Sequence, residues 1–236
     1  MFTQTYETRY SDYKDFDTLK PCVIMDVVQD ISILHSEKCG YGLNALRELN
    51  MAWLLLGIKV RFEDTLKTGV PLEVSTAVKR MKGATSERGC IIKQGGKVVA
   101  KTIANWFTFD SLKMKICKIP QDMGTAYEPY DFEDEFFNYA KPDILESAEV
   151  SYTVRVCNKE IDTNNHLNNK KAADLLTDAL PFDFNIKEMT LLYKTPAYLG
   201  DILNVCVEKT EKGYYVMLRN SDNDICVAGM FEGSSK

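Results

Sequence analysis

The feature that most limits what this chain can fold into is a series of structural signals that occurs twice. A Tyr-x-x-Arg motif, followed after several residues by Asp-Thr, opens each series. These motifs occupy residues 6–9 and 17–18 in the first half and residues 152–155 and 162–163 in the second. Their common order indicates that the 236-residue chain contains one structural unit in duplicate.

A helix is predicted after each opening motif, because apolar residues recur at the i, i+3, i+4, i+7 spacing of a helix that buries one face. Pro21 suits the first turn of the first helix and Gly40 suits its end, whereas Pro181 ends the second helix. The apolar positions are Ile24, Val27, Val28, Ile31 and Leu34 in the first helix and Ala172, Leu175, Leu176 and Ala179 in the second.

Strand-like segments follow each helix in the same order. Turn signals lead into the last segment of each half, at residues 95–96 and 223–224. One helix packed on several antiparallel strands is an α+β arrangement, so the sequence predicts two units that each carry a long helix on an antiparallel sheet. The segments lie at residues 69–74, 90–92 and 95–100 in the first half and at 200–205, 214–218 and 223–228 in the second.

The repeat divides the chain into an N-terminal domain at residues 1–120, an acidic linker at 121–148 and a C-terminal domain at 149–236. The linker is polar and contains proline. Its aromatic residues nevertheless predict that it packs against a domain instead of remaining extended in solvent. These are Phe132, Phe136, Phe137 and Tyr139.

The composition, 45% hydrophobic and 27% charged, is that of an ordinary globular protein. The seven cysteines are irregularly spaced and form no CxxC pair, which indicates a reducing compartment. The sequence shows neither a signal peptide nor an apolar run near the roughly 20 residues of a membrane span. We therefore expect a cytoplasmic protein that does not enter a membrane.

The net charge of −5 is unevenly distributed. Residues 79–118 contain ten Lys or Arg and two acidic residues, whereas residues 119–149 contain one Lys and nine acidic residues. A basic region on an acidic protein favours an acidic partner over non-specific binding to nucleic acid. The alternative is that the two blocks face water or each other.

The segment Asp162-Thr163-Asn164-Asn165-His166-Leu167-Asn168-Asn169 carries one of the two histidines. In an extended backbone the side chains of Asp162, Asn164 and His166 would point the same way. Asn168 or Asn169 can then cap the second helix. Polar groups at such a junction suit the hydrolysis of a carbonyl compound. The alternative is an Asx-rich turn with a capping role only.

The chain resembles the acyl-acyl carrier protein thioesterases, which include plant plastid enzymes and shorter bacterial relatives. The resemblance rests on residues 25–35, on Trp106 within residues 104–110 and on Asp162-x-Asn164-x-His166-x-Asn168-Asn169. It implies two tandem hotdog folds, which together mimic the dimer in which single hotdogs build their sites. It also implies hydrolysis of the thioester between a fatty acyl chain and carrier-protein phosphopantetheine. The first half would form most of the acyl tunnel and the second half would supply the chemistry.

The chain departs from this family after the second helix. Members often have a tyrosine, two basic residues and a glutamate, with a cysteine next in plant enzymes. The matching run, residues 193–201, has Pro196 in place of the glutamate and Ala197 in place of the cysteine. Alanine carries no nucleophile, so a Cys-His-Asn mechanism is excluded at that position. Either another carboxylate, with Glu188 as a candidate, replaces the glutamate, or three residues suffice.

The expected catalytic residues are Asp162, Asn164 and His166. Asp162 would act as general base or as nucleophile, which the sequence does not distinguish. His166 would activate water or protonate the leaving thiolate, and Asn164 would hold Asp162 or the water. Backbone N–H groups near Asn168 would stabilise the oxyanion. Asn168 and its neighbour Asn169 are expected to bind substrate, as is Trp106 in the first half.

No cofactor and no metal are expected. Two histidines without a cysteine cluster do not suit zinc, and no glycine-rich phosphate loop follows a strand. His35, the other histidine, lies beside the apolar face of the first helix, and we expect it to be packed and hydrogen-bonded.

Three other functions stay open. A hotdog hydratase or dehydratase acting on 3-hydroxyacyl thioesters resembles Asp-x-Asn-Pro-x-His, whereas here Asp162 and His166 are four residues apart without a proline. An acyl-CoA thioesterase would not need an acidic carrier protein to dock on Lys79, Arg80 and Lys82. An inactive acyl-binding protein would explain the departures described above. Chain-length preference and homodimer formation do not follow from one sequence.

Overall fold

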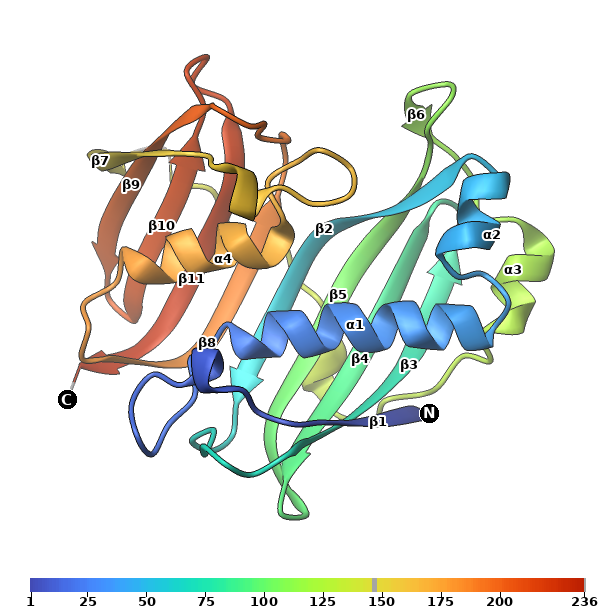
Figure 1. The fold of residues 1–236 in the computed structure, drawn as a ribbon, viewed down its shortest axis with the longest axis horizontal. Coiled ribbons are helices and arrows are strands. Elements are labelled where there is room, and N and C mark those ends of the chain that lie inside the picture. The colour runs from blue at the N-terminus through green and yellow to red at the C-terminus, as the bar shows by residue number, and fades with distance from the viewer. Residues whose placement is uncertain (146–147, 236) are drawn as a thin grey trace. The chain divides into compact units, whose positions relative to one another are not determined.

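The structure is a computed structural model that describes residues 1–145 and 148–235 (Figure 1). It divides into two compact units, Met1–Tyr139 and Ala140–Lys236, which we call unit 1 and unit 2. Residues 146 and 147, which belong to the predicted linker, lie outside the described residues. Each unit is an antiparallel sheet with a helix on it.

Unit 1 has a sheet in the order β1–β3–β4–β5–β2, in which all neighbouring strands are antiparallel. The short strand β6 pairs with the end of β5. The elements are β1 (Phe2–Tyr6), η1 (Tyr10–Asp12), α1 (Val23–Lys38), α2 (Leu43–Glu48), β2 (Met51–Phe62), β3 (Leu72–Lys82), β4 (Thr85–Gln94), β5 (Lys97–Asp110), β6 (Lys115–Ile116), α3 (Gln121–Ala126) and η2 (Glu135–Phe137).

Unit 2 repeats this plan with a sheet in the order β7–β9–β10–β11–β8. Position by position, β7 corresponds to β1, β9 to β3 and α4 to α1. The predicted duplication of one helix on an antiparallel sheet is therefore confirmed. The elements are β7 (Glu149–Arg155), η3 (Asn158–Glu160), α4 (Asn169–Asp178), β8 (Phe184–Tyr193), β9 (Ile202–Thr210), β10 (Gly213–Arg219) and β11 (Ile225–Ser235).

Helix α1 packs its apolar stripe on the sheet of unit 1, as its spacing predicts. Ile24 and Ile31 are fully buried, and Val28 is nearly so. Leu34 is 41% exposed, so the prediction that it shares this face is wrong: after Ile31 the buried positions of the helix are Ser32 and Ser36 instead. Gly40 follows that turn with φ of +79°, a conformation that glycine adopts without steric cost and that commonly ends helices.

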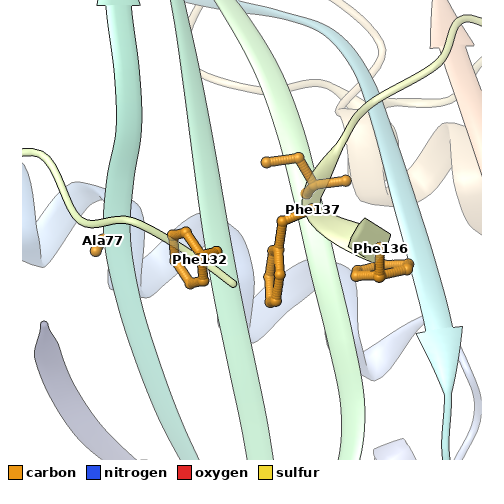
Figure 2. Close-up of a cluster of buried hydrophobic side chains, with 5 residues drawn as sticks. Ala77, Phe132, Phe136 and Phe137 are labelled. Carbon is orange, nitrogen blue, oxygen red and sulfur yellow. The ribbon is translucent and has the colours of Figure 1, made fainter. Parts of the chain in front are cut away.

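The segment that follows α3 packs on the sheet of unit 1 by means of its phenylalanines (Figure 2). The rings of Phe132 and Phe137 stack with centroids 4.2 Å apart, and both belong to a buried apolar cluster that includes Ala77. Gly89 lies beneath Phe132, and a Cβ atom there would come within 2.5 Å of the Phe132 ring. The prediction that this aromatic segment packs down is confirmed, and the packing leaves the opposite face of the sheet to α1.

In the parts of the chain that the structure describes, no helix is both long enough and apolar enough to span a membrane.

Candidate active site

The histidine motif of unit 2 forms a tight loop between η3 and α4. An antiparallel bridge between Ile161 and Leu167 closes the loop, and the Asp162 N–H donates to the His166 carbonyl at 2.8 Å. At the tip, Asn165 has φ of +63°. The backbone therefore turns back on itself here, and the extended conformation that the sequence suggested is wrong.

The carboxylate of Asp162 organises this loop. Its Oδ1 accepts hydrogen bonds from the backbone N–H groups of Asn164 at 2.8 Å and of His166 at 3.2 Å. A short acidic side chain competes well for nearby backbone donors, which is why Asp and Asn favour such turns over strands. Within the described residues Oδ2 of Asp162 accepts no hydrogen bond. One oxygen thus holds the loop while the other can meet a water molecule.

The loop gathers the three predicted catalytic residues without linking their side chains. Within the described part of the chain, neither the His166 imidazole nor the Asn164 carboxamide forms a hydrogen bond. The imidazole is partly buried and lies edge-on against the ring of Tyr198, with centroids 5.1 Å apart and an angle of 77° between the planes. Asn164 is exposed. The backbone places Asp162 and His166 side by side, and both side chains can reach a ligand.

Asn168 caps helix α4, which decides between the two asparagines that could do so. Its Oδ1 accepts from the N–H groups of Lys170 at 2.9 Å and Lys171 at 3.3 Å. Its own N–H donates to the Glu160 carbonyl at 2.8 Å. Asn169 is the first helical residue, and in the described residues its N–H has no hydrogen-bond partner. This N–H is therefore the donor near Asn168 that can serve an oxyanion.

We expect Asn168→Ala to lower the free energy of unfolding by about 1 kcal/mol, because it removes the side chain that satisfies two N–H groups at the start of α4. Urea denaturation of the parent and the variant measures this loss. Asn169→Ala is the matched control, since the Asn169 side chain makes no capping bond and only its carbonyl accepts from the Tyr193 hydroxyl. An equal loss in both variants would contradict the assignment.

A second segment, residues 194–201, lies against the loop. The Leu167 N–H donates to the Ala197 carbonyl at 2.8 Å, so Pro196 and Ala197 are indeed next to the histidine motif. They supply neither a carboxylate nor a thiol there. Glu188 lies within β8 opposite Glu232 of β11, and its role as a substitute stays a prediction.

Tyr198 is a site residue that the sequence did not single out. It is 50% exposed, its ring touches His166, and its N–H is held by the Asp201 carboxylate at 2.8 Å. One sequence signal could have identified Tyr198. It directly follows Pro196 and Ala197 in the run that departs from the family pattern.

Trp106, the predicted substrate-binding residue of the first half, lies in unit 1 on β5, paired with Leu55 of β2 and Ser86 of β4. Its indole Nε1 is buried, and the described residues provide it with no hydrogen-bond partner. A buried indole N–H normally finds an acceptor, so this group is suited to contact a ligand.

Unit 1 has a turn like that of Asp162 but without a histidine. Asp15 Oδ1 accepts from the N–H groups of Asp17 at 2.9 Å and Thr18 at 2.7 Å, and the bridge from Tyr13 to Leu19 closes the loop. The two bridges and the Lys14 N–H, which donates to the Thr18 carbonyl at 2.9 Å as the Asp162 N–H does to the His166 carbonyl, place Lys14 at the position of Asp162. The aspartate that sequence matching paired with Asp162 lies three residues further on. At the position of His166, unit 1 has Thr18.

Among residues 1–145 and 148–235, no group of three or more His, Cys, Asp or Glu side chains is arranged to hold a metal ion. The reactive groups of the loop are thus a carboxylate, an imidazole, a carboxamide and a helix N–H. Such a set can deliver water to a carbonyl carbon and stabilise the resulting oxyanion.

Two family profiles match the chain in succession. The acyl-ACP thioesterase N-terminal domain matches residues 1–127, and the acyl-ACP thioesterase C-terminal domain matches residues 142–229. The chain belongs to the acyl-ACP thioesterase family. The resemblance inferred from the sequence and the two hotdog-like domains that it implied are therefore confirmed. The histidine motif lies within the part that matches the C-terminal domain.

Solved structures of acyl-ACP thioesterases share this fold. An acyl-ACP thioesterase from Bacteroides thetaiotaomicron is similar with a TM-score of 0.88 and 18% identity over 99% of this chain and 97% of that one. The 12:0-ACP thioesterase from Umbellularia californica gives 0.84 and 15% over 100% and 97%. At these identities the likeness shows the fold alone. A search of curated proteins finds no significant match.

Proposed function

We propose that this member of the acyl-ACP thioesterase family hydrolyses the thioester of fatty acyl carrier protein, releasing a free fatty acid and ending chain elongation. The observation that carries the proposal is the loop of unit 2, in which Asp162 Oδ1 holds the His166 and Asn164 backbone while Oδ2 keeps its capacity to accept a hydrogen bond. Family membership supports the substrate class.

In this mechanism the Asp162 carboxylate takes a proton from water, or attacks the carbonyl carbon itself. The N–H of Asn169, at the positive end of the α4 dipole, stabilises the oxyanion. His166 protonates the leaving thiolate or orients the water, with Tyr198 restricting the ring. Asn164, exposed at the turn, holds the water. Asn168 contributes by setting the start of the helix.

The test is an assay of free thiol released from acyl carrier protein that bears saturated chains of graded length. Hydrolysis with a preferred length supports the proposal. Formation of a double bond on a 3-hydroxyacyl thioester, without thiol release, would instead identify a dehydratase. Binding of acyl carrier protein without any turnover would identify an acyl-binding protein.

The choice of carrier protein over CoA is supported by the hairpin between β5 and β6, residues 110–118. It extends past the other strands of unit 1 (Figure 1). Leu112, Met114 and Ile116 are 74%, 73% and 61% exposed. The basic side chains of Lys115 and Lys118 are exposed beside them, whereas Lys113 pairs with Asp110 at 2.9 Å. Apolar groups interleaved with positive charges suit an acidic protein with an apolar patch.

Lys79 and Arg80, by contrast, are held within unit 1. Lys79 Nζ donates to the Phe137 carbonyl at 2.9 Å and to Asn138 Oδ1 at 2.7 Å, and Arg80 pairs with Glu87 at 2.7 Å. These partners reduce the charge that either residue can offer to another protein. We therefore assign docking to the hairpin.

We expect the double variant Lys115→Glu/Lys118→Glu to lower kcat/KM for carrier-bound substrate about tenfold, because it reverses two charges that attract the acidic carrier. Turnover of the same acyl chain on CoA should stay unchanged. Lys67→Glu/Lys97→Glu is the control with the same charge change at the opposite end of β5. Equal losses on carrier and CoA substrates would refute docking through the hairpin.

A further inference from the structure

A charged side chain lies between α1 and the sheet of unit 1, where an apolar one would be expected. Arg88 of β4 is only 5% exposed. Its Nη1 lies 2.8 Å from His35 Nδ1 on α1 and 3.4 Å from Thr76 Oγ1 on β3. The guanidinium carbon lies 5.6 Å from the centre of the Tyr127 ring. The packing of α1 on the sheet thus encloses a guanidinium group.

This guanidinium has no countercharge in the described part of the chain, where Arg88 forms no ion pair. Its partner His35 is neutral at pH 7, because burial and the neighbouring Arg88 lower its pKa to about 4. The other charges that act on His35 are the N-terminal amine and Lys38, which are also positive. Enclosing a cation without an anion is among the costliest arrangements in a folded protein.

Two donors of the Arg88 side chain are also unused. Both of its hydrogen bonds involve Nη1, and within residues 1–145 and 148–235 neither Nε nor Nη2 forms one. The side of the guanidinium that is suited to bidentate contact is therefore not used by the protein itself.

We propose that Arg88 binds a small carboxylate in unit 1 through the Nε and Nη2 side of its guanidinium, between α1 and the sheet. A planar carboxylate matches the fork of these two donors and cancels the single charge. A phosphate is a poorer match, because only one cation contacts the position and neutral His35 adds no positive charge. The carboxylate could come from a free small acid or from the end of a fatty acid. This site is separate from the histidine loop of unit 2.

The experiment is thermal unfolding of the whole protein titrated with formate or octanoate, at an ionic strength kept constant with sodium chloride. We expect a saturable rise in the Tm of the parent, since a ligand that binds only the folded state stabilises it. Arg88→Met should abolish the rise. Arg80→Met, which removes an exposed arginine of the neighbouring strand, should preserve it. No saturable rise in the parent, or the same rise in Arg88→Met, would overturn the proposal.

A crystal structure of the parent soaked in formate decides the question if Arg88→Met does not fold. A planar ligand on Nε and Nη2 supports the site, and water alone at these atoms overturns it. A response to both acids means that the site accepts the end of a longer chain, whereas a response to formate alone restricts it to small acids. These measurements involve no turnover, so their outcome does not depend on whether the protein hydrolyses thioesters.

Discussion

Asp162→Asn should lower kcat for carrier-bound substrate by about 10²- to 10⁴-fold, the contribution typical of a general base. The carboxamide oxygen of asparagine can still accept from the Asn164 and His166 N–H groups, so the loop should keep its shape. What it loses is the negative charge that removes a proton from water. Steady-state release of thiol, with a single-turnover experiment to isolate the chemical step, measures the effect.

Two comparisons separate loss of chemistry from loss of structure. The Tm of Asp162→Asn should stay near that of the parent, whereas Asp162→Ala, which also removes the acceptor of two N–H bonds, should be less stable. Thr163→Ala changes an exposed residue of the same loop and should leave kcat unaltered. Hydrolysis by Asp162→Asn within threefold of the parent rate would remove Asp162 from the mechanism.

The parts of the fold that the sequence predicted correctly depend on local periodicity and on short signals. The apolar spacing of α1, the glycine after it and the asparagine cap of α4 each act within a few residues. Their repetition in a second half made the duplicated architecture predictable. The histidine motif was located for the same reason, because all of its residues lie in one short segment.

The errors arise where a different interaction decides the geometry. Alternating Asp162, Asn164 and His166 looks like a strand, but the Asp162 carboxylate captures backbone donors and the positive φ of Asn165 turns the chain. Tyr198 meets His166 only through the fold, since 32 residues separate them in the chain. No local pattern encodes that contact.

Arg88 shows the limit of charge patterns most clearly. In the sequence it is one of ten basic residues between 79 and 118 that together suggest a docking surface. In the fold it faces α1 and is buried, while Gly89 beside it lies beneath Phe132. Alternation along β4 sends neighbouring residues to opposite faces of the sheet. A count of charges contains no information about which face each residue takes.

The burial of His35 beside this arginine should make the stability of the protein depend on pH. The pKa of His35 is lowered to about 4 by burial and by Arg88, the N-terminal amine and Lys38, against 6.5 for a solvated histidine. Between pH 6.5 and pH 4 the unfolded chain therefore binds a proton that the folded chain does not. Stability contributed by neutral His35 is complete above pH 6.5 and is lost as the pH falls toward 4.

Between pH 7 and pH 5, protonation of this histidine should lower the unfolding free energy of the parent by about 1–2 kcal/mol. The upper value follows from the two pKa values. The lower value allows for partial exposure of the ring, which screens its charge. Urea denaturation at both pH values measures it, in buffers free of carboxylates so that no ligand neutralises Arg88. His35→Asn keeps an acceptor near Arg88 but does not titrate, so its loss should be smaller by that amount. Equal losses in the parent and in His35→Asn would show that other groups carry the pH dependence, and that the guanidinium does not hold His35 neutral.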